Sequence, residues 1–199
     1  MNRIWIFLSI VFSCMACTKE NFIDTGNASG IFDGSIMEYM RQHPQDWDST
    51  VVVIEWAGLA QLFEGKDPQY PEITFWGPTN LSIIRYMLDN GIKQVKDVEP
   101  EVWKSMMLRY VIPGKYKRED FATGDSKTGG DTFTALGGNH LRVYRVLTSY
   151  KDIPEAGPAE LWVHSSDTGY SVAQVASADI EPDNGIVHSL MYAFTFGKL

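Results

Sequence analysis

The amino-acid sequence predicts an α+β fold in which helices come first and β-strands follow. In the first half of the chain, apolar residues recur mainly at spacings of three and four, a pattern typical of helices that pack through one face. From about residue 132 the apolar period shortens towards two, which is typical of half-buried strands. Because helices precede strands and do not alternate with them, the regular parallel sheet of an α/β protein is not expected.

Residues 1–16 are predicted to be an export signal and not part of the folded domain. Arg3 is followed by an apolar run, residues 4–12, which is too short to span a bilayer. The next residues, Ser13-Cys14-Met15-Ala16, lead into Cys17 in a pattern that resembles a bacterial lipobox. This resemblance implies that Cys17 is lipidated and becomes the first residue of the mature protein. The alternative is an ordinary signal peptide with an incidental cysteine.

The positions of the cysteines and the net charge of the chain argue against some classes of function for this sequence. Both cysteines of the chain, Cys14 and Cys17, lie in this leader, so no disulfide is expected within the domain and its fold must rest on an apolar core. Cleavage before Cys17 removes Arg3 and leaves 16 basic against 25 acidic residues, a net charge of −9. Such a chain is a poor match to nucleic acid or anionic lipid headgroups. Acyl chains on Cys17 are therefore the expected membrane attachment.

The residues after Cys17 indicate where the protein resides. Residues 17–29 are polar and predict a flexible tether between the lipid and a domain that begins at Gly30. Export, lipidation and a tether together predict a cell-envelope protein, held most readily in the outer membrane of a Gram-negative bacterium. Both a periplasmic and an outward orientation of the domain fit the sequence.

Two helices are expected at the start of the domain. Ser35 is placed to cap a first helix that stops near His43-Pro44. Asp48 or Ser49 is expected to cap the second. The broad apolar stripe of this second region contains Val51, Val52, Ile54, Leu59, Leu62 and Phe63. The two tryptophans of this region are expected to pack in the core or at its rim.

A buried strand that turns abruptly into a helix is the most informative stretch. Residues 73–76 are β-branched and aromatic, which suits a buried strand. Pro78 ends that strand because it has no N–H to give to a neighbouring strand. Thr79 or Asn80 is then expected to cap a helix that ends near Asn90-Gly91. The apolar residues that fit this helix are Leu81, Ile83, Ile84, Met87 and Leu88.

One more helix and a series of strands complete the prediction. The helix starts at residues 97–100, where acidic side chains suit a helix N-terminus, and it ends before Ile112-Pro113-Gly114. The expected strands are residues 132–136, 141–147, 161–164 and 170–176, with a hairpin turn at Gly137-Gly138-Asn139 between the first two. Residues 124–130 are predicted to be a mobile loop and residues 151–160 an insertion between strands. A turn at Asp183-Asn184-Gly185 precedes a last buried strand.

Three segments resemble the motifs of the fasciclin domain. Residues 74–80, Thr-Phe-Trp-Gly-Pro-Thr-Asn, are similar to the family's first motif, a Thr-aliphatic-Phe-Ala-Pro-Thr-Asn/Asp run. Residues 184–188, Asn-Gly-Ile-Val-His, are similar to its second motif, an Asn-Gly-Val-Ile-His run. Between them, residues 108–114 match the family's Leu-Tyr-His-aliphatic-aliphatic-Pro-Gly segment. The resemblance covers roughly residues 30–190.

The resemblance implies a wedge of two β-sheets flanked by several N-terminal helices over residues 30–192, followed by a C-terminal tail at 193–199. It also implies extracellular binding or adhesion without shared catalytic machinery. Arg109-Tyr110 replaces the Tyr-His pair that animal members use in cell adhesion, so that activity is not carried over to this chain. The motif residues with an implied structural role are Thr74, Phe75, Pro78, Thr79, Asn80, Asn184, Gly185 and His188.

The sequence offers little catalytic chemistry. No two of its four histidines lie at the spacing of a zinc motif, and it contains neither a nucleophile elbow nor a phosphate loop. His188 with nearby carboxylates suggests a small envelope hydrolase, but a structural histidine is the favoured interpretation. Asp179, Glu181 and Asp183 offer oxygen atoms to a cation, although a solvated acidic loop is favoured. No cofactor and no metal are expected.

The leading hypothesis is a non-catalytic, lipid-anchored binding protein of the cell envelope, and its rival is the hydrolase. The expected partner is an envelope protein or an extracellular protein or glycan, and the sharper form is an accessory of an outer-membrane glycan-uptake system. Interaction is expected at residues 109–116, 124–130 and 151–160, since function concentrates on loops carried by a rigid scaffold. The candidate interaction residues are Arg109, Tyr110, Tyr116, Trp162 and Tyr170.

Overall fold

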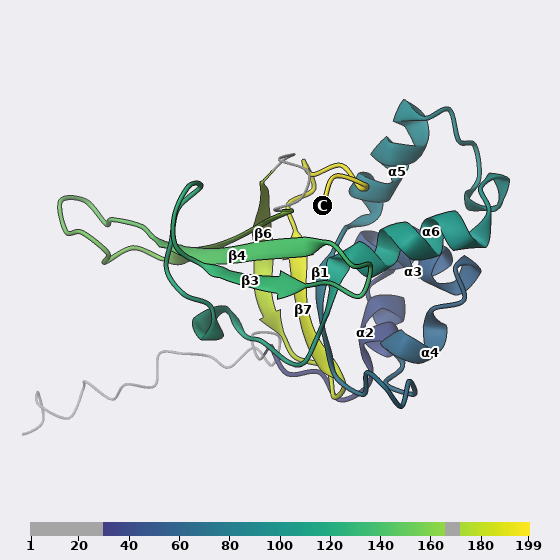
Figure 1. Ribbon diagram of the computed structural model, residues 1–199, viewed down its shortest axis with the longest axis horizontal. Helices are drawn as coiled ribbons and strands as arrows, with labels where there is room; N and C mark the ends of the chain where they lie inside the picture. The colour runs from purple at the N-terminus through teal and green to yellow at the C-terminus, as the bar shows by residue number, and fades with distance from the viewer. Residues whose placement is uncertain (1–29, 166–171) are drawn as a thin grey trace, which may run out of the picture.

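The computed structural model describes residues 30–165 and 172–199. The predicted signal, Cys17, the tether and Tyr170 lie outside the described residues. The fold is α+β as predicted, with helices packed against one side of a bent seven-stranded sheet (Figure 1). In the part of the chain that the structure describes, no helix combines the length and the apolar character needed to cross a membrane.

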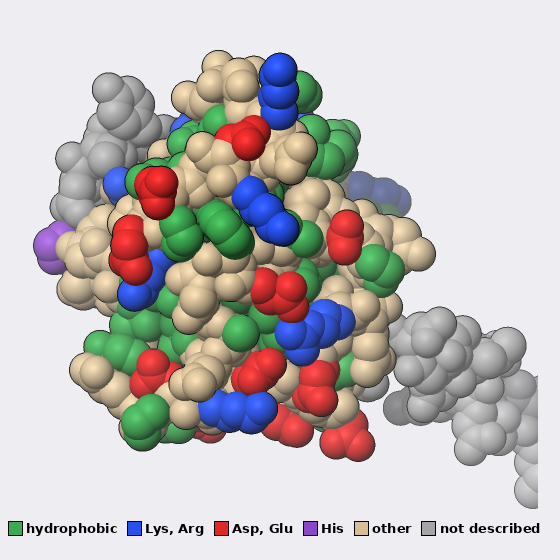
Figure 2. Space-filling model, turned by 90° about the vertical axis from the view of Figure 1, so that its right-hand side faces the viewer, with side chains coloured by type: hydrophobic (Ala, Val, Ile, Leu, Met, Phe, Trp, Pro, Cys, Tyr) green, Lys and Arg blue, Asp and Glu red, His purple; other side chains and the backbone are tan. Residues whose placement is uncertain are grey.

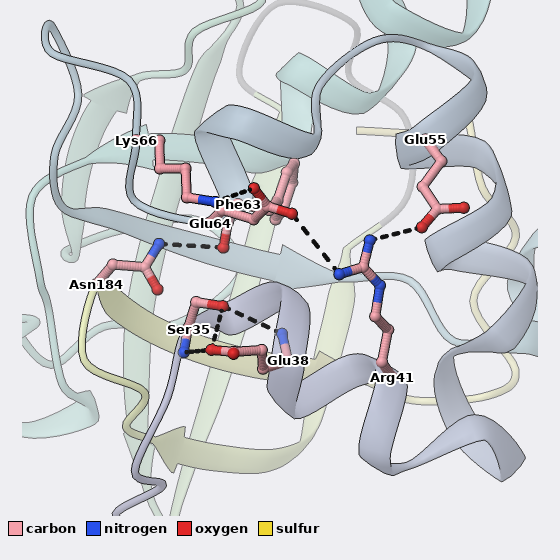
Figure 3. Close-up of polar contacts among 8 residues, drawn as sticks. All are labelled: Ser35, Glu38, Arg41, Glu55, Phe63, Glu64, Lys66 and Asn184. Carbon is pink, nitrogen blue, oxygen red and sulfur yellow. Dashed lines mark hydrogen bonds and ion pairs between the residues drawn. The ribbon is translucent and has the colours of Figure 1, made fainter.

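The domain begins with the helices α2 (Ile36–Gln42), α3 (Pro44–Trp56) and α4 (Ala60–Phe63). Ser35 caps α2 as predicted: its Oγ accepts from the N–H of Glu38, and the Glu38 carboxylate accepts from the N–H of Ser35 at 2.7 Å (Figure 3). The predicted caps of the second helix, Asp48 and Ser49, are wrong. Helix α3 starts at Pro44, because proline suits the first helical position, where its missing N–H leaves no hydrogen bond unmade.

The predicted corner between strand and helix is confirmed. Strand β1 (Ile73–Gly77) is buried along its whole length and leads into helix α5 (Asn80–Asp89), with Asn90 at the C-cap. Helix α6 (Pro100–Met107) follows, and short 3₁₀ turns lie at η1 (Val95–Asp97), η2 (Leu108–Tyr110) and η3 (Arg118–Asp120). Three residues expected to pack from α5 are instead exposed, since they lie on the side of the helix away from Ile83: these are Leu81, Ile84 and Leu88.

The remaining strands are β2 (Val111–Pro113), β3 (Asp131–Thr134), β4 (His140–Leu147), β5 (Ala159–Ser165), β6 (Ala173–Ile180) and β7 (Gly185–Leu190), in the sheet order β2-β1-β7-β6-β5-β4-β3. Strands β1 and β7 are parallel, and the other neighbouring strands are antiparallel. The hairpin turn predicted at residues 137–139 is confirmed between β3 and β4.

Strand β6 joins the two halves of the sheet. It pairs with β7 through an irregular register, and with β5 only at Gln174 opposite Trp162 and Ala173 opposite Val163. At the far edge, the N–H of Leu136 donates to the carbonyl of Val111 at 2.8 Å, which brings the end of β3 back to β2. The sheet is therefore a barrel-like wedge, in agreement with the predicted two-sheet wedge.

Residues 193–199, predicted to be a C-terminal tail, pack against the domain. Phe196 and Leu199 are fully buried, and the N–H of Gly197 donates to the Tyr110 hydroxyl at 2.7 Å. The Arg85 guanidinium donates to the carbonyls of three consecutive residues that start at Tyr192. The folded domain therefore extends to the last residue.

The helical face carries charges of both signs. Figure 2 shows Lys and Arg side chains interspersed with Asp and Glu and separated by small apolar spots. At one place Arg41 lies between two carboxylates, with Nη2 at 2.7 Å from Glu55 Oε1 and Nη1 at 3.6 Å from Glu64 Oε1 (Figure 3). This visible face therefore offers no field of a single sign to steer a charged partner.

Candidate functional site

The two main sequence motifs meet in the parallel β1–β7 ladder. Trp76 of the first motif is in register with His188 of the second. Thr74 joins the third segment to them, because its hydroxyl donates to the carbonyl of Gly114 at 2.7 Å and accepts from the N–H of Tyr116 at 2.9 Å. Phe75 is fully buried between β1 and the helices. These residues hold the centre of the sheet together.

Asn80 braces a neighbouring helix and does not cap its own. Its Oδ1 accepts from the N–H of Ser49 at 2.7 Å, and its Nδ2 donates to the carbonyls of Pro44 and Gln45 at 2.9 and 2.8 Å. Thr79 occupies the N-cap position of α5, but its hydroxyl makes no capping hydrogen bond. The corner at Pro78–Asn80 therefore fixes helix α3 against β1.

Asn184 and Gly185 join strand β7 to the helices. The Asn184 Oδ1 accepts from the N–H of Ile36 at 2.8 Å, and its Nδ2 donates to the carbonyl of Phe63 at 3.2 Å (Figure 3). A Cβ on Gly185 would lie 2.1 Å from the carbonyl oxygen of Ile73, so only glycine fits there. Both residues therefore hold strand β7 against its neighbours.

His188 is also structural. Its side chain is fully buried, its Nε2 lies 2.9 Å from the carbonyl of Tyr116, and its Nδ1 accepts from the N–H of Asp179 at 3.3 Å. Burial lowers the pKa of His188 to about 4, so the ring is neutral with its proton on Nε2. With both nitrogens bonded and no exposed surface, His188 cannot be the base of a hydrolase.

Two of the three acidic residues considered for a cation lie beside basic residues. Glu181 Oε2 lies 2.6 Å from Lys117 Nζ, and this hydrogen bond lowers the pKa of Glu181. Asp179 Oδ1 accepts from the backbone N–H of Arg118 at 2.6 Å. Among the described residues, no cluster of three or more His, Cys, Asp or Glu side chains is arranged to hold a metal. Glu181 and Asp179 are thus paired with basic residues, and Asp183 is exposed to solvent.

The segment expected to carry interaction residues is largely internal. Tyr110 is fully buried and its hydroxyl is bonded to Gly197, so its proposed role in interaction is wrong. Tyr116 is half-buried, with its ring 5.0 Å from that of Phe133. Arg109 is half-buried beside the hairpin turn, where its backbone nitrogen lies so close to Gly137 that a Cβ there would approach it to 2.8 Å. This segment supports the fold more than it offers a surface.

Trp162 lies in a different environment from Arg109, Tyr110 and Tyr116. Its neighbours on β5, Leu161 and Val163, are buried, so the indole points to the opposite, outer face of the sheet, where it is half-exposed. The register aligns it with Tyr144 on one side and Gln174 on the other. Its Nε1 donates to Glu160 Oε2 at 3.1 Å, which fixes the ring from its own strand.

Two hollows of about 270 Å³ each adjoin Trp162. The first is mostly apolar and lies towards β4, where its lining residues are Asp125, Ser126, Tyr144, Val146, Glu160, Trp162 and Val172. The second lies towards the C-terminal segment and includes Trp162, Val172, Gln174, Met191, Thr195 and Lys198. Trp162 and Val172 line both, so the two hollows adjoin; together they are here called the Trp162 groove.

The loop at residues 124–130, predicted to be mobile, is held over this face. Asp125 Oδ1 accepts from the N–H groups of Lys127 and Thr128, both at 2.7 Å. Arg142 reaches across from β4 and donates to the carbonyls of Asp125 and Gly129 at 2.9 and 2.8 Å. Its Nε donates to His164 Nε2 at 2.7 Å. These hydrogen bonds of Arg142 are here called the latch. The prediction of a mobile loop does not include it.

The insertion predicted at residues 151–160 projects from the end of the sheet, where β4 passes into β5 (Figure 1). Tyr150 and Ile153 pair through backbone hydrogen bonds of 3.1 Å, and both side chains are exposed. Glu160 is not part of the insertion, because it lies on strand β5. The insertion is therefore a separate projection beside the Trp162 groove.

Comparison with known proteins gives a family and a distant structural neighbour. A sequence profile of the fasciclin domain matches residues 45–193. A solved structure similar to this one is a FAS1 domain pair from the insect cell adhesion molecule fasciclin I, with 12% sequence identity and a TM-score of 0.44. That match covers 81% of this chain and 46% of the other, so this chain spans less than half the length of that protein. None of the curated protein sequences matches this one significantly.

Proposed function

The chain belongs to the fasciclin domain family, and we propose that it is a lipid-anchored binding or adhesion module of the cell envelope. Domains of this family are in general non-enzymatic adhesion domains. The match extends over most of the described chain, including both the motif corner and the outer face of the sheet. Binding, and not turnover, is therefore the function proposed.

The observation that carries this proposal is the contrast between the motif residues and Trp162. Asn184 and His188 are buried and bond to backbone groups of distant elements. Trp162 is half-exposed on the opposite side of its strand from the core, between two hollows. The motif residues thus stiffen a scaffold, and the scaffold presents the Trp162 groove to a ligand.

The proposed anchor is an acyl chain on Cys17, with residues 17–29 as the tether that joins it to the domain. Its support is the short apolar leader and the lipobox-like pattern before Cys17. Where the described chain begins, the N–H of Phe32 donates to the carbonyl of Glu181 at 2.9 Å, which ties the first residues to the sheet.

We further propose the outer membrane of a Gram-negative bacterium as the site of action, with an envelope protein or an extracellular protein or glycan as partner. In its sharper form, the protein is an accessory of an outer-membrane glycan-uptake system. The net charge of −9 after cleavage supports partners other than nucleic acid.

The test is lipid labelling and mild cross-linking in intact cells, with an affinity tag placed in the tether because Leu199 is buried and a C-terminal tag would displace it. Metabolic labelling with an alkyne fatty acid should mark the parent and the Cys14→Ser variant but not Cys17→Ser. Cross-linking of the parent should recover an outer-membrane transporter or a glycan-binding lipoprotein. An unlabelled parent refutes the anchor, and recovery of no envelope partner refutes the accessory role.

A further inference from the structure

We infer that the Trp162 groove binds an uncharged oligosaccharide, with one sugar ring in each hollow and the Trp162 indole between them. This inference rests on the proposed binding function and adds a ligand class and a site to it. Its starting point is geometric: a half-exposed tryptophan separates two hollows of about 270 Å³ each. Each hollow is smaller than the roughly 300–1,000 Å³ of a drug-sized ligand pocket, which suits a single small ring.

The indole is held ready for stacking before any ligand arrives. Its Nε1 is bonded to Glu160, and its cross-strand neighbours are Tyr144 and Gln174. Tyr144 is held in turn by Arg142, because the Arg142 guanidinium lies over the Tyr144 ring, 4.7 Å from its centre. A fixed aromatic face loses little conformational entropy on binding, and it suits the C–H face of a sugar ring.

The first hollow combines an apolar floor with carboxylates at its side. Val146 and Val172 contribute to a surface that is almost wholly apolar, and the acidic residues Glu160 and Asp125 are among its lining residues. A carboxylate has about four acceptor sites, and the indole of Trp162 uses one on Glu160. Further sites on Glu160 can accept from sugar hydroxyls while the ring lies on the apolar floor.

The second hollow offers different polar groups around a similar floor. Gln174 provides an amide that both donates and accepts, and Thr195 provides a hydroxyl. Met191 and Phe194 supply apolar surface. Donors and acceptors of both kinds are what the hydroxyl groups of a second sugar ring require.

The charges near the first hollow distinguish neutral sugars from acidic ones. An acidic sugar in the first hollow would place its carboxylate beside Glu160 and Asp125, and like charges at such range repel. The mature chain adds a net charge of −9 to this local effect. The first hollow should therefore favour a neutral ring over a uronate or a sulfated one, whereas Lys198 gives the second hollow the opposite charge.

The test is a titration of the domain against an array of neutral glycans and against oligogalacturonides, followed by calorimetry on any positive oligosaccharide. The parent should bind a neutral chain and no oligogalacturonide. Trp162→Ala should weaken that binding at least tenfold in a variant that remains folded. Tyr150→Ala, which removes an exposed aromatic ring outside both hollows, should leave the affinity unchanged.

Glu160→Gln sharpens the test, since it removes the charge and keeps an acceptor. It should narrow the gap in affinity between neutral and acidic chains by at least tenfold. Three outcomes would overturn the inference. The parent binds acidic chains, or Trp162→Ala and Tyr150→Ala lose affinity for the neutral oligosaccharide equally, or the parent binds none of the neutral glycans. In the last case, recovery of an envelope protein by cross-linking would leave the proposed binding function standing with a protein ligand.

Discussion

The imidazole of His188 is stacked on the indole of Trp76, with ring centroids 4.8 Å apart and 23° between the ring planes. The two residues are in register on the parallel strands β1 and β7, so the stack joins the two sequence motifs at the centre of the sheet. Trp76 stands where the family usually has phenylalanine, and its larger ring covers the histidine. This pair explains why His188 is a scaffold residue.

The first prediction concerns pH. The pKa of His188 is about 4 in the folded chain against an ordinary value of 6.5, because burial disfavours the charged ring. Below pH 6.5 the unfolded chain takes up a proton that the folded chain refuses. The stability that depends on neutral His188 is therefore complete above pH 6.5 and falls by about 3 kcal/mol as the pH drops towards 4.

NMR of the imidazole resonances provides the check for this prediction. The His188 signals should stay those of a neutral ring, protonated on Nε2, from pH 8 down to pH 5. A His188 midpoint at or above pH 6 would contradict the structural account.

The second prediction concerns Gly185. A methyl group there would meet the carbonyl of Ile73 at 2.1 Å, which is backbone and cannot move aside without opening the β1–β7 ladder. Gly185→Ala should cost about 3 kcal/mol or more in the free energy of unfolding. Gly138→Ala is the comparison, because Gly138 has a positive φ of 84° but no atom near its absent Cβ.

The Gly138 variant should cost only about 1–2 kcal/mol, the penalty of a left-handed conformation alone. Denaturant unfolding of both variants measures the two values. Equal costs would show that the close approach at Gly185 is relaxed in solution.

The third prediction concerns Asn184. Asn184→Asp keeps the acceptor for the N–H of Ile36 but loses the donor to the carbonyl of Phe63, and it buries a charge. At pH 7 the variant should lose about 3 kcal/mol of stability. Lowering the pH should recover part of this loss, because a protonated aspartic acid can again donate to Phe63. A parent-to-variant difference that does not change with pH would refute this assignment of the amide.

The fourth prediction concerns the latch on the loop at residues 124–130. Arg142→Ala removes the donors to Asp125 and Gly129, so hydrogen exchange in this loop should accelerate at least tenfold. Arg145→Ala, three positions further along β4, removes a donor to the carbonyl of Phe121 before the loop and is the comparison; it should leave residues 125–129 protected. Equal acceleration in both variants would mean that general destabilisation is responsible.

The same latch should respond to pH. Burial and the Arg142 charge lower the pKa of His164, and the neutral Nε2 is what accepts from Arg142. The contact is therefore fully present above the ordinary value of 6.5 and is lost as the pH falls through the lowered pKa. The check is to measure hydrogen-exchange rates of the loop across this pH range in the parent and in His164→Ala. The rates of the two proteins should differ at neutral pH and converge in acid.

Much of the scaffold could be predicted because short-range rules set it. The Ser35 cap, the corner at residues 73–80 and the turn at 137–139 each depend on neighbours a few residues away. The start of α3 was mispredicted because Pro44 competes with Asp48 for the first turn, and a proline after a helix end can also begin the next helix. The sequence contains a start signal at Pro44 and another at Asp48, and the helix can begin at only one of them.

The Trp162 groove could be predicted only in part. Period-two spacing places Tyr144 and Trp162 on outer faces, but their pairing depends on a register set across the projecting insertion between β4 and β5. The burial of the last residues also had a signal, the alternating Phe194 and Phe196, yet the ring partners of Phe196 lie on helices α5 and α6, far away in sequence. Long-range packing of this kind cannot be predicted from a local pattern.

The central claim is that ligands meet the outer face of the sheet and not the helical face. Paired photo-cross-linking tests it most directly, with a benzophenone amino acid at Val146, which lines the first hollow, or at Leu88, which is exposed on helix α5. Irradiation of intact cells should give adducts with envelope glycans or proteins from position 146 and none from position 88. Adducts only from position 88, or from neither position, would contradict the account.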